Sequence, residues 1–139
     1  MNATIFQSEA RMRFSKIQVI FLLVTIGLIA LRVTHTSQVS VAGRWQCSGT
    51  GLDTETVTFR LELTQSGSSL SGIWIINGEE IPIREGKIQD NRIELITFAD
   101  DKKFTSVATL QGEEFKGTWK DDTGRSGIWQ GKRMPAGSK

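Results

Sequence analysis

The chain has 139 residues, enough for one small domain, with 23% charged residues and a formal net charge of +2 at pH 7. It contains a single cysteine, Cys47, and a single histidine, His35. This composition excludes an intramolecular disulfide, a thiolate metal cluster and a histidine-based triad within the folded part of the chain. We therefore assign no catalytic residue, no metal site and no cofactor.

The positive charge is confined to the N-terminal part of the chain. Residues 1–40 carry four basic side chains against one acidic, whereas residues 41–139 carry 13 basic against 14 acidic. A nucleic-acid-binding domain needs a basic face. The mixed charge of residues 41–139 therefore predicts no nucleic-acid partner.

Residues 1–16 are polar and basic, and an apolar run follows them. Residues 17–31 carry no charge. A bilayer span takes about 20 apolar residues, whereas a signal-peptide core takes about 7–15. Because Lys16 and Arg32 can extend their charged ends toward the membrane surface, we expect a transmembrane signal anchor over residues 17–33. A cleaved signal peptide and a buried soluble helix are the alternatives.

The flanking residues set the expected orientation. Three basic residues precede the apolar run, which places the N-terminus in the cytoplasm and the C-terminal domain outside the cytoplasmic membrane. Ser40-Val41-Ala42 offers small residues for signal cleavage, although it lies about ten residues beyond the apolar run, further than usual. Cleavage there would give a secreted or periplasmic domain. Cys47 lacks the context of a lipoprotein signal, so we expect no lipid attachment.

Beyond a polar tether, residues 34–40, the pattern is that of short strands. The clearest alternation is Val57, Phe59, Leu61 and Leu63, with polar residues between them. Turn signals recur roughly every 8–12 residues and no helical period appears. Residues 41–133 therefore predict an all-β fold, a small up-and-down antiparallel β-barrel of about eight strands, followed by a tail over residues 134–139.

Two short signals refine this strand pattern. Asn77-Gly78 is typical of a two-residue hairpin. Pro82 has no backbone N–H, so we expect its strand to be an edge strand or to contain a bulge.

Each of the four tryptophans is the third residue of a Gly-x-Trp. The four are Trp45, Trp74, Trp119 and Trp129. Residues two apart in a strand share a face, so each glycine should leave an empty slot beside an indole ring. In a small barrel these rings fill the core. Alternatively, all four line a ligand pocket at an open end. Each buried indole N–H then needs an acceptor, from Gln130, Ser106 or a ligand.

Other side chains receive simpler interpretations. Cys47 should be a small buried hydrophobe. The acidic pairs at positions 79–80, 100–101, 113–114 and 121–122 fall at turns, where we expect solvated hairpin tips. Four apolar residues occupy outward positions, namely Ile73, Ile75, Ile96 and Phe98. Either bulges shift them inward or they form an outer apolar patch.

The placement of Gly43, Trp45 and Arg133 resembles the calycin group, which includes lipocalins and avidins. In lipocalins a Gly-x-Trp opens the barrel, and an arginine after the last strand packs across that tryptophan. The resemblance implies that these three residues close one end of the barrel. The domain is also similar to uncharacterised bacterial exported domains with repeated Gly-x-Trp strands.

The domain departs from both calycin families. It is shorter than a lipocalin and lacks the terminal helix of that family. It contains no tyrosine, so no biotin-binding residues are carried over from avidins.

These features predict a membrane-anchored, extracytoplasmic and non-enzymatic β-barrel that binds a small apolar ligand or a protein partner. The alternative is a structural or protein-interaction domain with a filled barrel core and an outer apolar contact patch. An enzyme that used only carboxylates, lysine and arginine ranks third.

Overall fold

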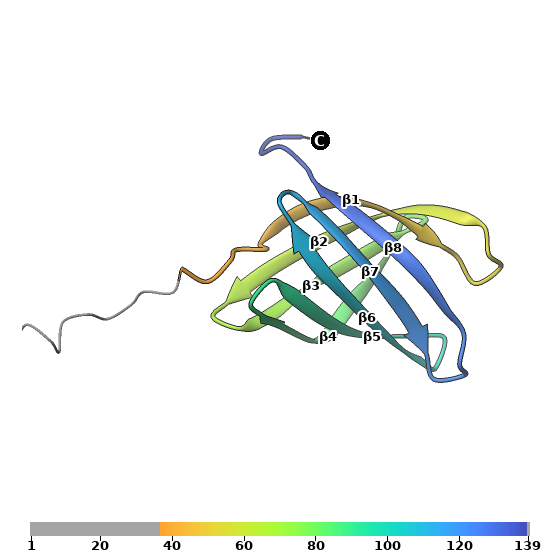
Figure 1. Ribbon diagram of the computed structural model, residues 1–139. Helices are drawn as coiled ribbons and strands as arrows, with labels where there is room; N and C mark the ends of the chain where they lie inside the picture. Colours follow the sequence, from red (N-terminus) through yellow and green to blue (C-terminus); the bar gives the residue numbers. More distant parts are fainter. Residues whose placement is uncertain (1–36, 139) are drawn as a thin grey trace, which may run out of the picture. The chain divides into compact units, whose positions relative to one another are not determined.

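The computed structural model describes residues 37–138, which contain one closed antiparallel β-barrel (Figure 1). Each strand pairs with the next in sequence, and the last pairs with the first. The strands are β1 (Gly43–Thr50), β2 (Thr56–Ser66), β3 (Ser69–Ile76), β4 (Glu79–Gln89), β5 (Arg92–Ala99), β6 (Lys102–Gln111), β7 (Glu114–Asp121) and β8 (Ser126–Arg133). The eight-stranded barrel predicted from the alternation is confirmed.

The N-terminal predictions lie outside the described residues. They concern the basic segment 1–16 and the hydrophobic helix over residues 17–33. Within residues 37–138, no helix is long and apolar enough to cross a membrane.

Local sequence explains the individual hairpins. Leu61 and Leu63 of β2 are 0% and 5% exposed, whereas the intervening outward residues are polar. Asn77 and Gly78 adopt φ values of 53° and 82°, which is the left-handed conformation that a tight two-residue hairpin requires. The prediction of a hairpin at this position is confirmed.

Strand β4 differs from the expectation of an edge strand. It lies between β3 and β5 in a closed barrel, and Pro82 is paired with Ile73. The predicted bulge is present, because the β4–β5 register shifts between Ile83 and Glu85. Ile83 and Ile88 are five positions apart, and the shift lets both face inward, at 9% and 2% exposed.

The glycines of the Gly-x-Trp pairs do not leave empty slots. A Cβ at Gly72 or Gly117 would overlap a backbone carbonyl oxygen of the neighbouring strand, that of Glu62 or Val107. A Cβ at Gly127 would lie 2.5 Å from the Trp119 indole nitrogen. Gly72 and Gly117 therefore mark places where adjacent strands approach closely, as the bends of a small closed barrel require, whereas Gly127 leaves room for the Trp119 ring.

Candidate functional site: the two ends of the barrel

Aromatic side chains fill the middle of the barrel. Trp45, Trp74 and Trp129 are 0%, 6% and 3% exposed. Their rings and two phenylalanine rings form a continuous series of contacts. The ring centroids lie 5.5 Å apart for Phe59–Trp74, 5.3 Å for Trp74–Trp129, 5.9 Å for Trp129–Phe115 and 4.2 Å for Phe115–Trp45. We call this series the aromatic column, and it makes three of the four tryptophans core residues.

One buried indole N–H of the column lacks an acceptor within residues 37–138. Trp45 Nε1 donates to the Val41 carbonyl oxygen at 3.0 Å, and Trp119 Nε1 donates to that of Thr50 at 2.9 Å. Trp129 Nε1 is buried and has no partner among the residues that the structure describes. Neither acceptor suggested by the sequence serves it, because Gln130 faces outward and Ser106 makes no such bond.

Several contacts of Arg133 gather at one end of the barrel, which we call the closed end. The chain enters the barrel at Gly43 and leaves it at Arg133, and both lie at this end (Figure 1). The Arg133 guanidinium carbon lies 4.4 Å from the centroid of the Trp45 ring. Arg133 Nε also donates to Glu113 Oε2 at 2.7 Å. The stacking implied by the lipocalin resemblance is therefore present, and its role in closing the barrel stays a prediction.

The closed end includes residues 39–42, which we call the strap. Val41 is 0% exposed, and its backbone N–H donates to Gln65 Oε1 at 2.8 Å. Val39 and Ser40, which we assigned to a free tether, are thus part of the barrel end. Gln65 escaped the sequence analysis, although it continues the inward alternation of β2.

The opposite end, which we call the open end, is less well covered. Here the β1–β2, β3–β4, β5–β6 and β7–β8 connections turn. Five large inward apolar side chains at this end are only partly buried, and they are Phe59, Ile76, Ile81, Phe104 and Trp119. We call them the apolar rim. By contrast, the inward layer at the closed end, including Ile93 and Phe115, is fully buried.

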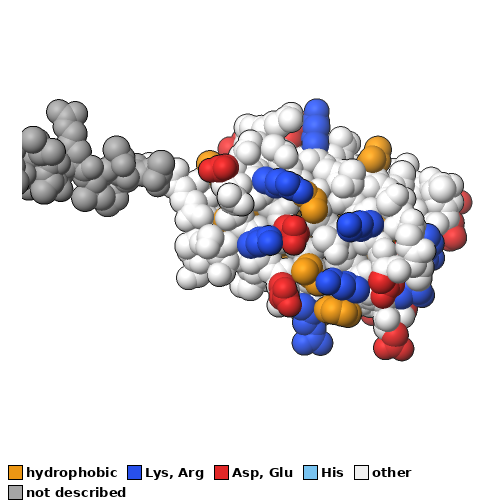
Figure 2. Space-filling view, turned by 60° about the horizontal axis from the view of Figure 1, so that its bottom comes forward, with side chains coloured by type: hydrophobic (Ala, Val, Ile, Leu, Met, Phe, Trp, Pro, Cys, Tyr) orange, Lys and Arg blue, Asp and Glu red, His pale blue; other side chains and the backbone are white. Residues whose placement is uncertain are grey.

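The turns at the open end are acidic. The basic residues there are Lys102, Lys103 and Arg125, and the acidic residues are Asp53, Glu55, Glu79, Glu80, Asp100, Asp101, Asp121 and Asp122. Elsewhere the charges are mixed, and Figure 2 shows a face where Lys and Arg side chains lie among Asp and Glu, with few hydrophobic side chains. A negative potential at the open end follows from this distribution.

Asp121 is the exception among these acids, because it is buried at 6% exposed and is not a solvated tip. Its Oδ1 accepts from the N–H groups of Thr123 and Arg125, both at 3.0 Å, and from the Thr123 hydroxyl at 2.7 Å. Arg125 Nη2 lies 2.7 Å from Oδ2. Burial raises the pKa of this carboxyl, but the hydrogen bonds from Thr123 and Arg125 outweigh it and lower the pKa to about 2.

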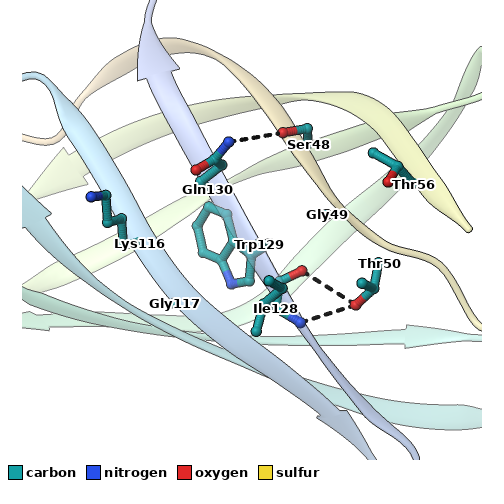
Figure 3. Close-up of a pocket in the computed structure, with 9 residues that line it drawn as sticks. All are labelled: Ser48, Gly49, Thr50, Thr56, Lys116, Gly117, Ile128, Trp129 and Gln130. Atoms are coloured by element: carbon teal, nitrogen blue, oxygen red, sulfur yellow. Dashed lines mark hydrogen bonds between the residues drawn. The ribbon is translucent and has the colours of Figure 1, made fainter. Parts of the chain in front are cut away.

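A groove runs along the outer wall over β1, β7 and β8. It consists of two adjoining hollows of about 410 and 490 Å³, which share Ser48, Lys116 and Gln130. Figure 3 shows the first hollow, where Gln130 bonds Ser48 and Thr50 bonds the backbone of Ile128. Trp129 also lines this hollow, but the outward side chains there are mainly polar and the other three indoles are not in its lining, so the groove differs from the pocket of four indoles suggested by the sequence.

The four outward apolar residues do face solvent. The register shifts fall beside β4 and leave the alternation of β3 and β5 intact. Phe98 is 51% exposed, while Ile73, Ile75 and Ile96 are half-buried. The interpretation that bulges turn them inward is therefore wrong, and they form an outer apolar patch together with Pro82.

Reactive and metal-binding groups are scarce in the described part. Cys47 is 2% exposed, and burial raises the pKa of its thiol to about 12. It is thus a small core side chain, as predicted. Residues 37–138 contain no group of three or more His, Cys, Asp or Glu side chains that could hold a metal ion.

The fold is similar to that of several designed β-barrels and of one natural protein. A redesigned β-barrel, b11L5F_LGL, matches with a TM-score of 0.58 at 17% identity over 68% of this chain and 92% of its own. The redesigned barrel mFAP1, bound to DFHBI, matches with a TM-score of 0.55 at 16% identity over 67% and 94%.

A natural protein shares this fold as well. The Schistosoma mansoni fatty acid binding protein in complex with arachidonic acid matches with a TM-score of 0.52 at 15% identity over 71% and 99%. No protein-family model matches the chain, and no curated protein matches it. At these identities the likeness concerns the fold alone.

Proposed function

We propose that this protein is a non-enzymatic binding module that takes a small apolar ligand at the open end of the barrel. The supporting observation is the contrast between the two ends, because among residues 37–138 only the open end leaves large inward apolar side chains partly exposed. Exposed apolar surface at the mouth of a barrel is where a ligand gains most from leaving water. In this proposal residues 17–33 anchor the protein in the cytoplasmic membrane, with the barrel outside the cytoplasm.

The filled interior limits the size of the ligand. The aromatic column occupies the middle of the barrel, so a bound molecule contacts the apolar rim and the outer end of the column at Phe59 and Trp74. Trp129, one ring further in, has an N–H donor without a partner in residues 37–138. A small flat molecule with one hydrogen-bond acceptor fits this arrangement. The fold neighbours bound to DFHBI and to arachidonic acid support the choice of a small apolar ligand.

Native mass spectrometry of the full-length protein, gently extracted from its own host, tests both parts of the proposal. A reproducible adduct that is lost on denaturation is the expected result for the ligand. A mass for all 139 residues is the expected result for the anchor. A mass short of the first 36–42 residues would contradict the anchor and leave the ligand proposal standing.

A pair of substitutions locates the ligand. Trp119→Ala at the open end should weaken binding of the identified ligand at least about tenfold, since a buried aromatic contact contributes on the order of 1.5 kcal/mol. Phe98→Ala on the outer wall is the matched control and should bind normally. Equal affinities of the two variants would contradict a site at the open end.

The outer apolar patch favours a second function, contact with a protein partner. Phe98 is 51% exposed beside Ile96 on the same strand, and Ile73 faces Pro82 across the β3–β4 pair. Crosslinking in the host should then capture a partner that is lost with Phe98→Ser and kept with Trp119→Ala. The opposite pattern would assign the partner to the open end.

A further inference from the structure

The strap is bound to the barrel as a peptide would be bound to a receptor. The carbonyl oxygens of its four residues each accept a hydrogen bond from a side chain of the barrel. Val39 accepts from Gln65 Nε2 at 3.1 Å, Ser40 from Arg133 Nη2 at 2.9 Å, Val41 from Trp45 Nε1 at 3.0 Å and Ala42 from Arg133 Nη1 at 2.7 Å. Three side chains from β2, β1 and β8 therefore hold four successive peptide groups.

One side chain of the strap is recognised as well. Val41 is 0% exposed and belongs to the hydrophobic core, and its N–H donates to Gln65 Oε1 at 2.8 Å. The site thus accepts an extended backbone with one small aliphatic side chain. Since the other contacts go to backbone atoms, they place little demand on the rest of the sequence.

The strap can leave without disturbing the sheet. It precedes β1, which begins at Gly43, and is no part of the strand ladder. Gly43 is exposed, and its φ of 130° lies in a region that favours glycine, so it can serve as a hinge. Departure of the strap would leave the Arg133 guanidinium, the Gln65 amide and the Trp45 N–H without these acceptors. The emptied site would expose the apolar pocket of Val41 to water, so a peptide that refills this pocket and restores the bonds would be favoured.

We infer that the closed end of the barrel is a binding site for an extended peptide segment, that the strap fills it within one chain, and that the strap of a second copy can fill it instead. The second copy is the chosen source because every copy carries both the site and a segment that fits it. This inference concerns the closed end and does not depend on the ligand proposed for the open end.

The test uses the full-length chain in mild detergent with the substitution Val41→Asp, which places a charge in the apolar pocket and expels the strap. The probe is a labelled synthetic peptide of residues 36–42, and the control peptide carries the same Val41→Asp change. Fluorescence anisotropy should show that the variant chain binds the probe at least tenfold more tightly than the unchanged chain does, and that it ignores the control. A folded variant that binds neither peptide, or both equally, would overturn the inference.

A second variant covers the case in which Val41→Asp does not fold. Gly43→Val strains the hinge, because a β-branched residue avoids positive φ, and it leaves every residue of the strap and its site unchanged. The same tenfold gain in peptide binding is expected, and binding equal to that of the unchanged chain would overturn the inference.

Exchange between copies is tested by co-purifying tagged and untagged Gly43→Val chains. Recovery of the untagged copy, lost when excess probe peptide is added, supports the second copy as occupant. Recovery that the peptide does not reduce would overturn that part of the inference.

Discussion

The two ends of this barrel are built from the same alternating strands and differ in what covers them. At the closed end, the strap, Gln65 and Arg133 bury the innermost layer, and Val41 and Trp45 have no exposed surface. At the open end nothing comparable lies over the apolar rim in the described chain, and the turns carry acids in place of a covering segment. The inward apolar side chains are therefore fully buried at the closed end and only partly buried at the open end.

The contrast shows that the two ends of a barrel can differ in how well they are covered even when aromatic rings fill the interior. The aromatic column connects them, from Phe59 at the open end to Trp45 and Arg133 at the closed end. A change at one end should therefore be measured against a matched change at the other.

The largest difference is expected for the two phenylalanines of the column. Phe115 is 0% exposed and contacts two indole rings, so Phe115→Ala should lower the free energy of unfolding by about 3–5 kcal/mol. Phe59 is only partly buried, and Phe59→Ala should cost less than about 2 kcal/mol. Urea unfolding measures both, and equal losses would break the distinction between the ends.

Replacement of Arg133, which bonds the strap, should have the next largest effect on the free energy of unfolding. Arg133→Ala deletes hydrogen bonds to two strap carbonyls and the stacking on Trp45, which together should cost about 2–3 kcal/mol. The control is Arg60→Ala, which removes only an exposed ion pair of 3.8 Å and should cost less than about 1 kcal/mol. If Arg133→Ala unfolds no more easily than the control, the strap contributes little to the seal.

Acid should weaken the open end through Asp121. The pKa of its carboxyl falls from an ordinary value of 3.8 to about 2 on folding. The folded state binds the proton more weakly, so the stability from Asp121 is complete above about pH 4 and is lost as the pH falls toward 2. Unfolding curves at a series of pH values should show this loss, and Asp121→Asn should reduce it. If Asp121→Asn loses as much stability in acid as the unchanged protein does, Asp121 is not the cause of the loss.

The smallest expected difference between variants is in the rate at which Cys47 is alkylated. This rate reports how often the barrel opens. Its thiol is 2% exposed with a pKa of about 12, so alkylation at pH 8 should be at least about 1000-fold slower than for a free cysteine. Arg133→Ala should accelerate labelling more than Arg60→Ala does. Rapid labelling of the unchanged protein would contradict a sealed end.

The strands were predictable because each depends on neighbouring residues. The alternation of Leu61 and Leu63, and the Asn77-Gly78 turn, act over a few positions. The seal was not predictable in this way, since Val41 bonds a residue 24 positions away and Arg133 reaches a carbonyl 91 positions away. Only the lipocalin resemblance pointed to part of it.

The alternation of inward and outward residues could have identified two of the side chains at the barrel ends. Gln65 and Asp121 each continue an inward alternation at the end of a strand, where a polar residue must find a partner to be buried. The glycines could not have been interpreted from sequence, because the close approach that requires Gly72 and Gly117 depends on how neighbouring strands bend.

The binding of the strap to the barrel also has a consequence for maturation of the chain. The small residues that a signal peptidase would read, Ser40-Val41-Ala42, are folded into the closed end, and both Ser40 and Ala42 are held by Arg133. In the folded barrel the Ala42–Gly43 bond is therefore held by hydrogen bonds, although Ser40 and Gly43 are exposed. A chain cut after Ala42 before folding would begin at Gly43. It would lack Val41, the side chain that fills the closed end of its own barrel.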